Sequence, residues 1–127
     1  MILLDTNVWV RYVTNDDAAQ AARAMRVISK STAIFVPKTV LLELERVLRA
    51  VYGLSADAVE RSLLHVLGLP VVKPEEPEAV AAALEHYRGG LDFADALHMV
   101  SAEGVFHTFD EKCVRKAKAR SLKVAQV

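Results

Sequence analysis

The chain has 127 residues, a length that suits one domain around one hydrophobic core, so we expect residues 1–127 to form a single domain. Its composition, 53% hydrophobic and 25% charged, excludes a disordered chain. The 16 basic and 16 acidic residues cancel, which excludes nucleic-acid binding through bulk positive charge but allows a local basic patch.

The chain also lacks the marks of a membrane or disulfide-bonded protein. No apolar run approaches the roughly 18 residues that a membrane span needs, and Asp5 interrupts the apolar start, so we expect no signal peptide. Cys113 is the only cysteine, which rules out an internal disulfide. These features fit the reducing cytoplasm.

The first half of the chain is predicted to alternate short strands with helices. Ile2–Leu4 is a continuous apolar run, which is typical of a strand buried on both faces of a parallel sheet. The other elements expected here are a helical turn over Val8–Val13, a helix over Ala18–Ser31, a strand over Ala33–Val36, a helix from Pro37 to about Tyr52, and a helix over Ala56–Leu67 capped by Ser55.

The second half continues the same alternation. We expect a minimal strand at Val71–Val72, helices over Ala79–Tyr87 and from Asp92 to about Ala102, a strand over Val105–Phe109, a basic helix over Glu111–Arg120, and a last strand over Leu122–Val124. Strands that alternate with helices indicate an α/β fold with a parallel sheet and right-handed crossovers.

Acidic residues stand where strands end. Asp5 directly follows the first strand, and Asp110 follows the strand over Val105–Phe109. Ligands bind at the carboxyl ends of strands in open parallel sheets, so both acids have a functional position. After Asp5, Thr6 and Asn7 can donate hydrogen bonds that orient a carboxylate or a metal-bound water. The alternative for Asp5 is a helix cap.

Other acids open helices. Glu43 lies near the start of a helix that follows a strand and close to the helix's apolar stripe, so we expect it to be either half-buried and paired or a ligand. Asp92 and Asp95 follow the breaker pair Gly89-Gly90, at the N-cap and N3 positions of a predicted helix. Taken alone, this spacing is ordinary capping chemistry.

Five carboxylates are expected at the same edge of the predicted parallel sheet, where strands end and helices begin. They are Asp5, Glu43, Asp92, Asp95 and Asp110. Without matching cations they would repel, so some pKa values would rise or a cation would bind. All-oxygen ligands favour Mg²⁺ or Mn²⁺, and no Cys/His cluster points to zinc. One or two such cations would polarise a phosphodiester and activate a water for in-line attack.

Four ordered motifs carry a family resemblance: Leu3-Leu4-Asp5-Thr6-Asn7, Glu43-Leu44 within Val40–Leu48, Asp92-Phe93-Ala94-Asp95-Ala96-Leu97-His98, and Thr108-Phe109-Asp110. In this order, over nearly the whole chain, they resemble PIN domains, in particular the VapC-type ribonuclease toxins of toxin–antitoxin pairs. The resemblance implies a three-layer α/β/α sandwich with a short central parallel sheet of four to five strands. It also implies a Mg²⁺- or Mn²⁺-dependent endoribonuclease.

The resemblance assigns roles residue by residue. Asp5, Glu43, Asp95 and Asp110 match the family's acidic quartet, and Asp92 matches an extra acid of many members. Polar positions that support the site are matched by Thr6, Asn7 and Thr108. The resemblance further implies a homodimer and a VapB-like antitoxin that inserts into the active-site groove, forming a hetero-oligomer.

The remaining side chains have more than one interpretation. The basic last helix is either a solvated face or a source of phosphate contacts, for which Arg115 and Lys116 are the candidates. We expect Glu45, Arg46 and Arg49 to form a solvated face and His98 to be buried and hydrogen-bonded. Trp9 and Tyr12 share a helix face, which is either core or an oligomer interface.

Two rival functions remain open. A non-catalytic PIN-like module would bind RNA or a partner, although the full set of acids argues against it. An Asp-based phosphotransfer domain is a poorer match: a haloacid-dehalogenase-like phosphatase needs a second acid where Asn7 stands, and a receiver needs an acidic pair beside the first strand, where Asp5 stands alone.

Overall fold

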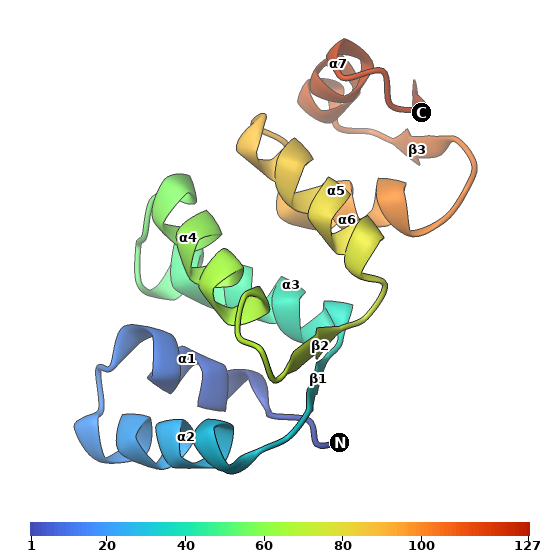
Figure 1. The fold of residues 1–127 in the computed structure, drawn as a ribbon. Helices are drawn as coiled ribbons and strands as arrows, with labels where there is room; N and C mark the ends of the chain where they lie inside the picture. Colours follow the sequence, from blue (N-terminus) through green and yellow to red (C-terminus); the bar gives the residue numbers. More distant parts are fainter. The chain divides into compact units, whose positions relative to one another are not determined.

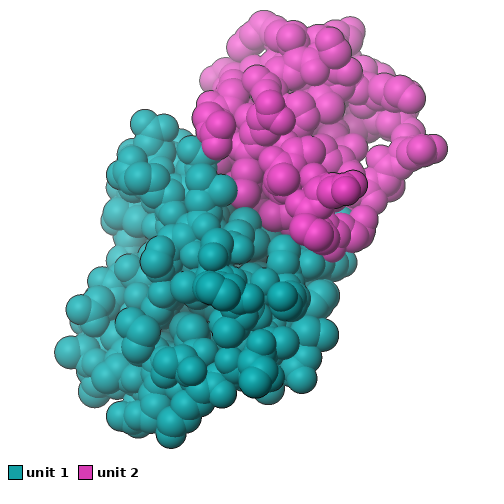
Figure 2. Space-filling model, viewed as in Figure 1, with its two compact units in different colours: residues 1–75 teal, residues 76–127 magenta.

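The computed structural model describes all 127 residues and divides them into two compact units. Unit 1 comprises Met1–Glu75 and unit 2 comprises Glu76–Val127 (Figure 2). Each unit contains helices and one pair of parallel strands.

Unit 1 begins with two helices that run in opposite directions side by side, and it continues with alternating strands and helices (Figure 1). Its elements are α1 (Thr6–Thr14), α2 (Ala18–Lys30), β1 (Ile34–Val36), α3 (Lys38–Arg46), the π-helical turn η1 (Val47–Val51), α4 (Ala56–Leu67) and β2 (Val72–Pro74). The helix expected from Pro37 to Tyr52 is thus present, with its last turn widened to π geometry. Ser55 caps α4 as predicted, by accepting a hydrogen bond from the backbone N–H of Ala58.

The N-terminal segment is less regular than expected. Only Ile2 pairs, through an isolated parallel bridge to Ile34, so the predicted strand over Ile2–Leu4 is wrong beyond its first residues. Leu3 is 62% exposed, whereas Leu4 is buried. The reason is local: Asp5 caps α1 and the chain turns into that helix at Thr6, which leaves little length for a strand.

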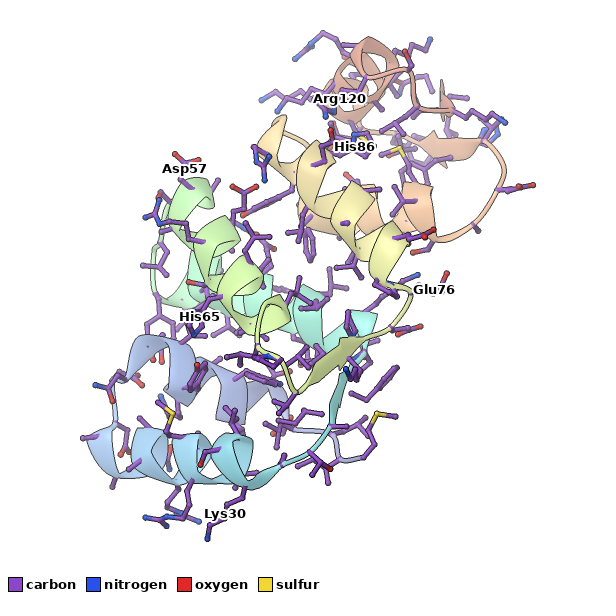
Figure 3. The ribbon with its side chains drawn as sticks, in the orientation of Figure 1. Lys30, Asp57, His65, Glu76, His86 and Arg120 are labelled. Atoms are coloured by element: carbon purple, nitrogen blue, oxygen red, sulfur yellow. The ribbon has the colours of Figure 1, made fainter.

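The core of unit 1 lies under α1, α3 and α4 around β1. Trp9 is fully buried, which confirms its core interpretation, and its ring meets Tyr12 edge-on at 6.0 Å between ring centroids. Tyr12 Oη lies 2.8 Å from Nε2 of His65, an α4 residue labelled in Figure 3. The other fully buried side chains of the unit are Ile34, Val36, Leu41, Leu44, Leu48, Val59, Leu63 and Val66.

Glu45 corrects one expectation for α3. It is 3% exposed rather than solvated, and Oε2 accepts a hydrogen bond from Nε of Arg49 at 2.8 Å. At about 100° per residue, Glu45 falls on the same side of the helix as Leu41 and Leu48, which are core residues. By the same count Glu43 faces away from that stripe, and it is exposed.

Unit 2 carries the remaining elements, which are α5 (Pro77–Arg88), α6 (Phe93–Ser101), β3 (Phe106–Thr108), α7 (Glu111–Ala119) and β4 (Val124–Gln126). Helix α5 begins two residues earlier than expected, with Pro77 in its first turn, where a missing N–H costs nothing. Its last turn packs onto α6 through Tyr87 and Phe93, which meet edge-on at 5.4 Å between centroids. Arg120 Nε donates to His86 Nδ1 at 2.8 Å and ties the end of α7 to α5 (Figure 3).

The strands of each unit pair in parallel. Strand β1 pairs with β2 in the register Ile34 to Val72, and β3 pairs with β4 in the register Phe106 to Val124. The α/β class is therefore as predicted, but the hydrogen-bonded strands form two pairs rather than the expected sheet of four to five strands. No helix is long and apolar enough to cross a membrane.

Candidate active site

In unit 1, one threonine connects two of the predicted acids. Asp5 is the N-cap of α1, and its Oδ1 accepts a hydrogen bond from Thr6 N at 2.9 Å. The buried Thr6 hydroxyl donates to Glu43 Oε1 at 3.1 Å, across from α1 to α3. Thr6 therefore holds the Glu43 carboxylate beside the start of α1, and the expectation that Thr6 donates to a carboxylate is confirmed.

Asn7, the next predicted polar position, faces elsewhere. It is exposed and lines a hollow of about 300 Å³ between α1 and α2, together with Arg11 and Gln20. The walls of this hollow are mostly apolar, with Val8 and Val27 among them. The structure thus separates Asn7 from the contact between Thr6 and Glu43.

In unit 2, two aspartates cap consecutive helices. Asp92 caps α6, since its Oδ2 accepts a hydrogen bond from Asp95 N at 3.1 Å. Asp110 caps α7 and accepts through Oδ1 from the backbone N–H groups of Lys112, at 2.9 Å, and Cys113, at 3.1 Å. The backbone N–H of Asp110 in turn donates to Thr108 Oγ1 at 3.1 Å, so Thr108 supports the turn that carries Asp110.

These caps place three acids around one hollow. Asp92, Asp95 and Asp110 line a space of about 130 Å³ between the starts of α6 and α7. The rest of the lining consists of Leu91, Lys112, Cys113 and Lys116. Asp92 and Asp95 come from one helix and Asp110 from another, so the grouping is tertiary and exceeds ordinary capping.

Burial and charge around this hollow shift the pKa values of Asp95 and Cys113. Partial burial raises the pKa of Asp95, and the negative charge of Asp92 adds to the rise. A hydrogen bond with the Cys113 thiol acts in the opposite direction, by favouring the ionised Asp95. Burial, with the charge of Asp95, raises the pKa of Cys113 to about 11. The sequence-based expectation that crowded acids would show a raised pKa holds for Asp95.

Two residues of the hollow escaped the sequence analysis. Cys113 looked like an isolated cysteine, yet it is three residues after the capping Asp110 and so turns inward at N3 of α7. Lys112 lies four residues before Lys116 on the same helix, and this spacing puts both on one side of α7. Their relation to Asp95 depends on how α6 and α7 pack, which no local pattern states.

His98 and Arg115 are both exposed, and neither lines the acidic hollow. His98 is exposed and stacks on Phe106 at 5.8 Å between ring centroids, so its expected burial is wrong. The residue stands at the outer side of α6, whose inner side is occupied by Phe93, Ala96 and Leu97. Arg115 is exposed and does not line the acidic hollow, whereas Lys116 does.

The predicted acids therefore fall into two groups, Asp5 with Glu43 in unit 1 and Asp92, Asp95 and Asp110 in unit 2. No group of three or more His, Cys, Asp or Glu side chains is arranged to hold a metal ion. The chemistry of the donors nevertheless fits a hard cation, because all are carboxylates and the desolvated Asp95 sits beside two more negative charges.

Comparison with protein families matches residues 2–119 to the PIN domain. The chain belongs to the PIN-domain family. None of the curated proteins compared with this PIN domain matches it. PIN domains are typically nucleases and generally use divalent metal ions. Membership of the family therefore supports nuclease activity and RNA as the substrate class.

Proposed function

We propose that this PIN domain is a Mg²⁺- or Mn²⁺-dependent endoribonuclease and the toxin of a VapBC-type toxin–antitoxin pair. The observation that carries the proposal is the convergence of Asp92, Asp95 and Asp110 on one hollow, in a chain whose residues 2–119 match the PIN domain. Three carboxylates from two helices are more than caps require, and they make a region that a divalent cation would stabilise.

We assign Asp5, Glu43, Asp95 and Asp110 as the catalytic acids and cation ligands, with Asp92 as a further ligand. A divalent cation, when bound, supplies the positive charge that phosphodiester hydrolysis needs. The chain's own residues hold the ligands. Thr6 orients Glu43 through its hydroxyl, and Thr108 accepts the hydrogen bond from Asp110 N. Asn7 lines the separate hollow between α1 and α2, and its place next to Thr6 in the sequence is what supports its assignment as a supporting residue.

This assignment treats residues 1–127 as one PIN domain. Its support is that the family match runs from residue 2 to residue 119 and so includes all five acids. Residues 115 and 116 of the basic helix remain our candidates for RNA contacts, and Lys116 is the one that lines the acidic hollow.

The partners follow from the same resemblance to VapC-type toxins. We propose a homodimer and a VapB-like antitoxin that occupies the acidic groove, with the toxin acting on RNA in the cytoplasm. The neighbouring reading frame tests this directly. A small frame that encodes a DNA-binding N-terminus and a flexible tail is the expected neighbour.

The cleavage assay tests the enzyme itself. Purified protein is incubated with total RNA and Mg²⁺ or Mn²⁺, with and without a chelator. We expect cleavage that the chelator stops, and we expect Asp95→Asn to reduce the rate by about 100-fold or more, because losing even an outer-shell partner of a metal typically costs 10–100-fold. Asp57→Asn, on the exposed first turn of α4, is the matched control and should leave the rate unchanged (Figure 3).

Growth provides the second measurement. Expression without an antitoxin should slow growth, and Asp5→Asn or Asp95→Asn should relieve the effect. RNA binding without any cleavage in Mg²⁺ or Mn²⁺ would instead identify a non-catalytic PIN module.

A further inference from the structure

The acidic hollow has a basic wall. Lys112 and Lys116 line it together with Asp92, Asp95 and Asp110, so two basic and three acidic residues surround a space of about 130 Å³. A water molecule takes up about 30 Å³ in the liquid. The hollow therefore has room for a phosphate group and a few waters.

Helix α7 aims its basic residues in two directions. Cys113, Val114 and Ala117 are its buried residues. At about 100° per residue, Lys112 and Lys116 lie within about 40° of each other on one flank of that buried stripe. Lys118 falls on the opposite flank, whereas Arg115 lies on the outer face about 60° from Lys112; both are exposed. The basic helix is therefore not a uniform charged face.

Both lysines have a hydrogen bond beside the hollow, Lys112 through its backbone and Lys116 through its side chain. The backbone N–H of Lys112 is fixed by Asp110 Oδ1 at 2.9 Å. Lys116 Nζ donates to the carbonyl oxygen of Gly90 at 3.0 Å, which draws its side chain across to the turn before α6. A neutral carbonyl is a weaker partner for an ammonium than an anion is, so a phosphate can take its place.

We propose that Lys112 and Lys116 bind a backbone phosphate of RNA at the acidic hollow, and so position the strand against Asp95 and Asp110. This inference rests on the proposed ribonuclease function for its substrate. The lysines supply positive charge on one wall, where the carboxylates alone would repel a phosphate. Lys118, on the opposite flank, takes no part in this contact.

The test measures salt dependence, which counts phosphate contacts. All proteins carry Asp95→Asn to prevent cleavage, and a fluorescent single-stranded RNA of mixed sequence is titrated by anisotropy between about 50 and 200 mM salt. Each lost phosphate contact should reduce the slope of log K against log salt by about 0.7 for single strands. Because the two lysines share one phosphate, we expect the double variant to lose about 0.7 of the slope, each of Lys112→Ala and Lys116→Ala to lose part or all of that amount, and Lys118→Ala to lose none.

Two further variants separate a phosphate contact from a structural role. Lys116→Gln keeps a donor for the Gly90 carbonyl but removes the charge. It should reduce the slope of log K against log salt as much as Lys116→Ala does. Lys116→Arg should retain the slope of the parent. Circular dichroism confirms that each variant is folded.

The outcomes distinguish this inference from the proposed function. Wild-type cleavage with unchanged slopes for Lys112→Ala and Lys116→Ala, or a parent-like slope for Lys116→Gln, overturns the inference and leaves the ribonuclease standing. Lost slopes in a protein whose wild type cleaves no RNA support the phosphate contact and overturn the function. Absence of RNA binding by the parent overturns both.

Discussion

Asp92 and Asp110 combine helix capping with a place in the acidic hollow. Asp110 accepts both of its capping hydrogen bonds through Oδ1, and Asp92 accepts through Oδ2. Each carboxylate therefore has a second oxygen that the cap does not use. A cap and a cation ligand are compatible in one residue, so the two interpretations of the helix start at Asp92 do not exclude each other.

Cys113 offers a direct test of the environment of Asp95. Burial and the charge of Asp95 raise the pKa of this thiol from 9.0 to about 11. The thiolate is the reactive form, so at pH 8 its population should fall by about 100-fold. We expect iodoacetamide to label the native protein about 100-fold more slowly than the urea-unfolded chain, as measured by mass spectrometry. Asp95→Asn should speed native labelling, since it removes the negative neighbour.

Equal labelling rates in the native and unfolded protein would contradict the buried position of Cys113. The comparison needs no substrate or cation, because it probes the thiol alone.

Residue-scale chemistry was predictable where its partners are near in sequence. The caps at Ser55 and Asp92 bind N–H groups three residues away, so spacing alone indicates them. Glu45 was misread because the phase of the helix, and not the residue type, decides its burial. Its charge is matched by Arg49, four residues later.

At the scale of elements, contacts between residues far apart in the sequence determine how a helix is capped and where a strand begins and ends. Pro37 has no side chain able to cap α3, and Glu75 does it instead, since its Oε1 accepts from Lys38 N at 2.9 Å across 37 positions of the chain. The last strand was expected at Leu122–Val124 and lies at Val124–Gln126. Its pairing with β3 sets those limits, and such a register is tertiary information.

The junction of α1 and α2 depends on one ionised carboxylate. Asp16 accepts hydrogen bonds from the Tyr52 hydroxyl and from Arg11 NH1, at 2.8 Å to Oδ2. The Tyr52 bond is the largest cause, with Arg11 and Thr14 adding to it, and together they lower the pKa of Asp16 from 3.8 to about 2. Asp16 thus connects the end of α1 to the end of η1.

A lowered pKa fixes the direction of the pH dependence. The ionised Asp16 stabilises the fold above its unfolded pKa, and this contribution is lost as pH falls from about 4 to about 2. We therefore expect the urea midpoint of the wild type to fall as the pH is lowered over this range. The urea midpoint of Asp16→Asn should fall less. At pH 7 the variant should be the less stable protein, and the difference should disappear near pH 2. Asp57→Asn serves as the control, with a profile like that of the wild type; parallel curves for Asp16→Asn would refute the role of Asp16.

For the whole molecule, the order of motifs carried more information than any one motif. The acids were predicted by their positions after strands and at helix starts, and the family match over residues 2–119 agrees with that order. The grouping was less predictable. Asp92, Asp95 and Asp110 meet in unit 2, where the starts of α6 and α7 surround one hollow, and Thr6 bonds Glu43 in unit 1, where α1 packs against α3.

The division of acids between the units leads to a prediction about the complete enzyme. Asp5 and Glu43 belong to unit 1, and Asp95 belongs to unit 2. If one chain forms one PIN domain, as we propose, each active site draws all its acids from a single chain. A mixture of Asp5→Asn and Asp95→Asn proteins then contains no intact site, even when the two are co-expressed and assemble together.

We accordingly expect the co-expressed mixture to cleave RNA no faster than either variant alone. Sites built from unit 1 of one chain and unit 2 of another would behave differently. In a mixed dimer of that kind, as in a domain-swapped dimer, one site would carry both substitutions and the other neither, so about half of the sites would have both acids intact. The assay compares the mixture with wild type at equal protein concentration, after tandem purification through two tags has selected the mixed species. Recovery of a substantial fraction of wild-type activity would show that two chains share each site, and the single-chain domain would have to be abandoned while the acidic residues kept their roles.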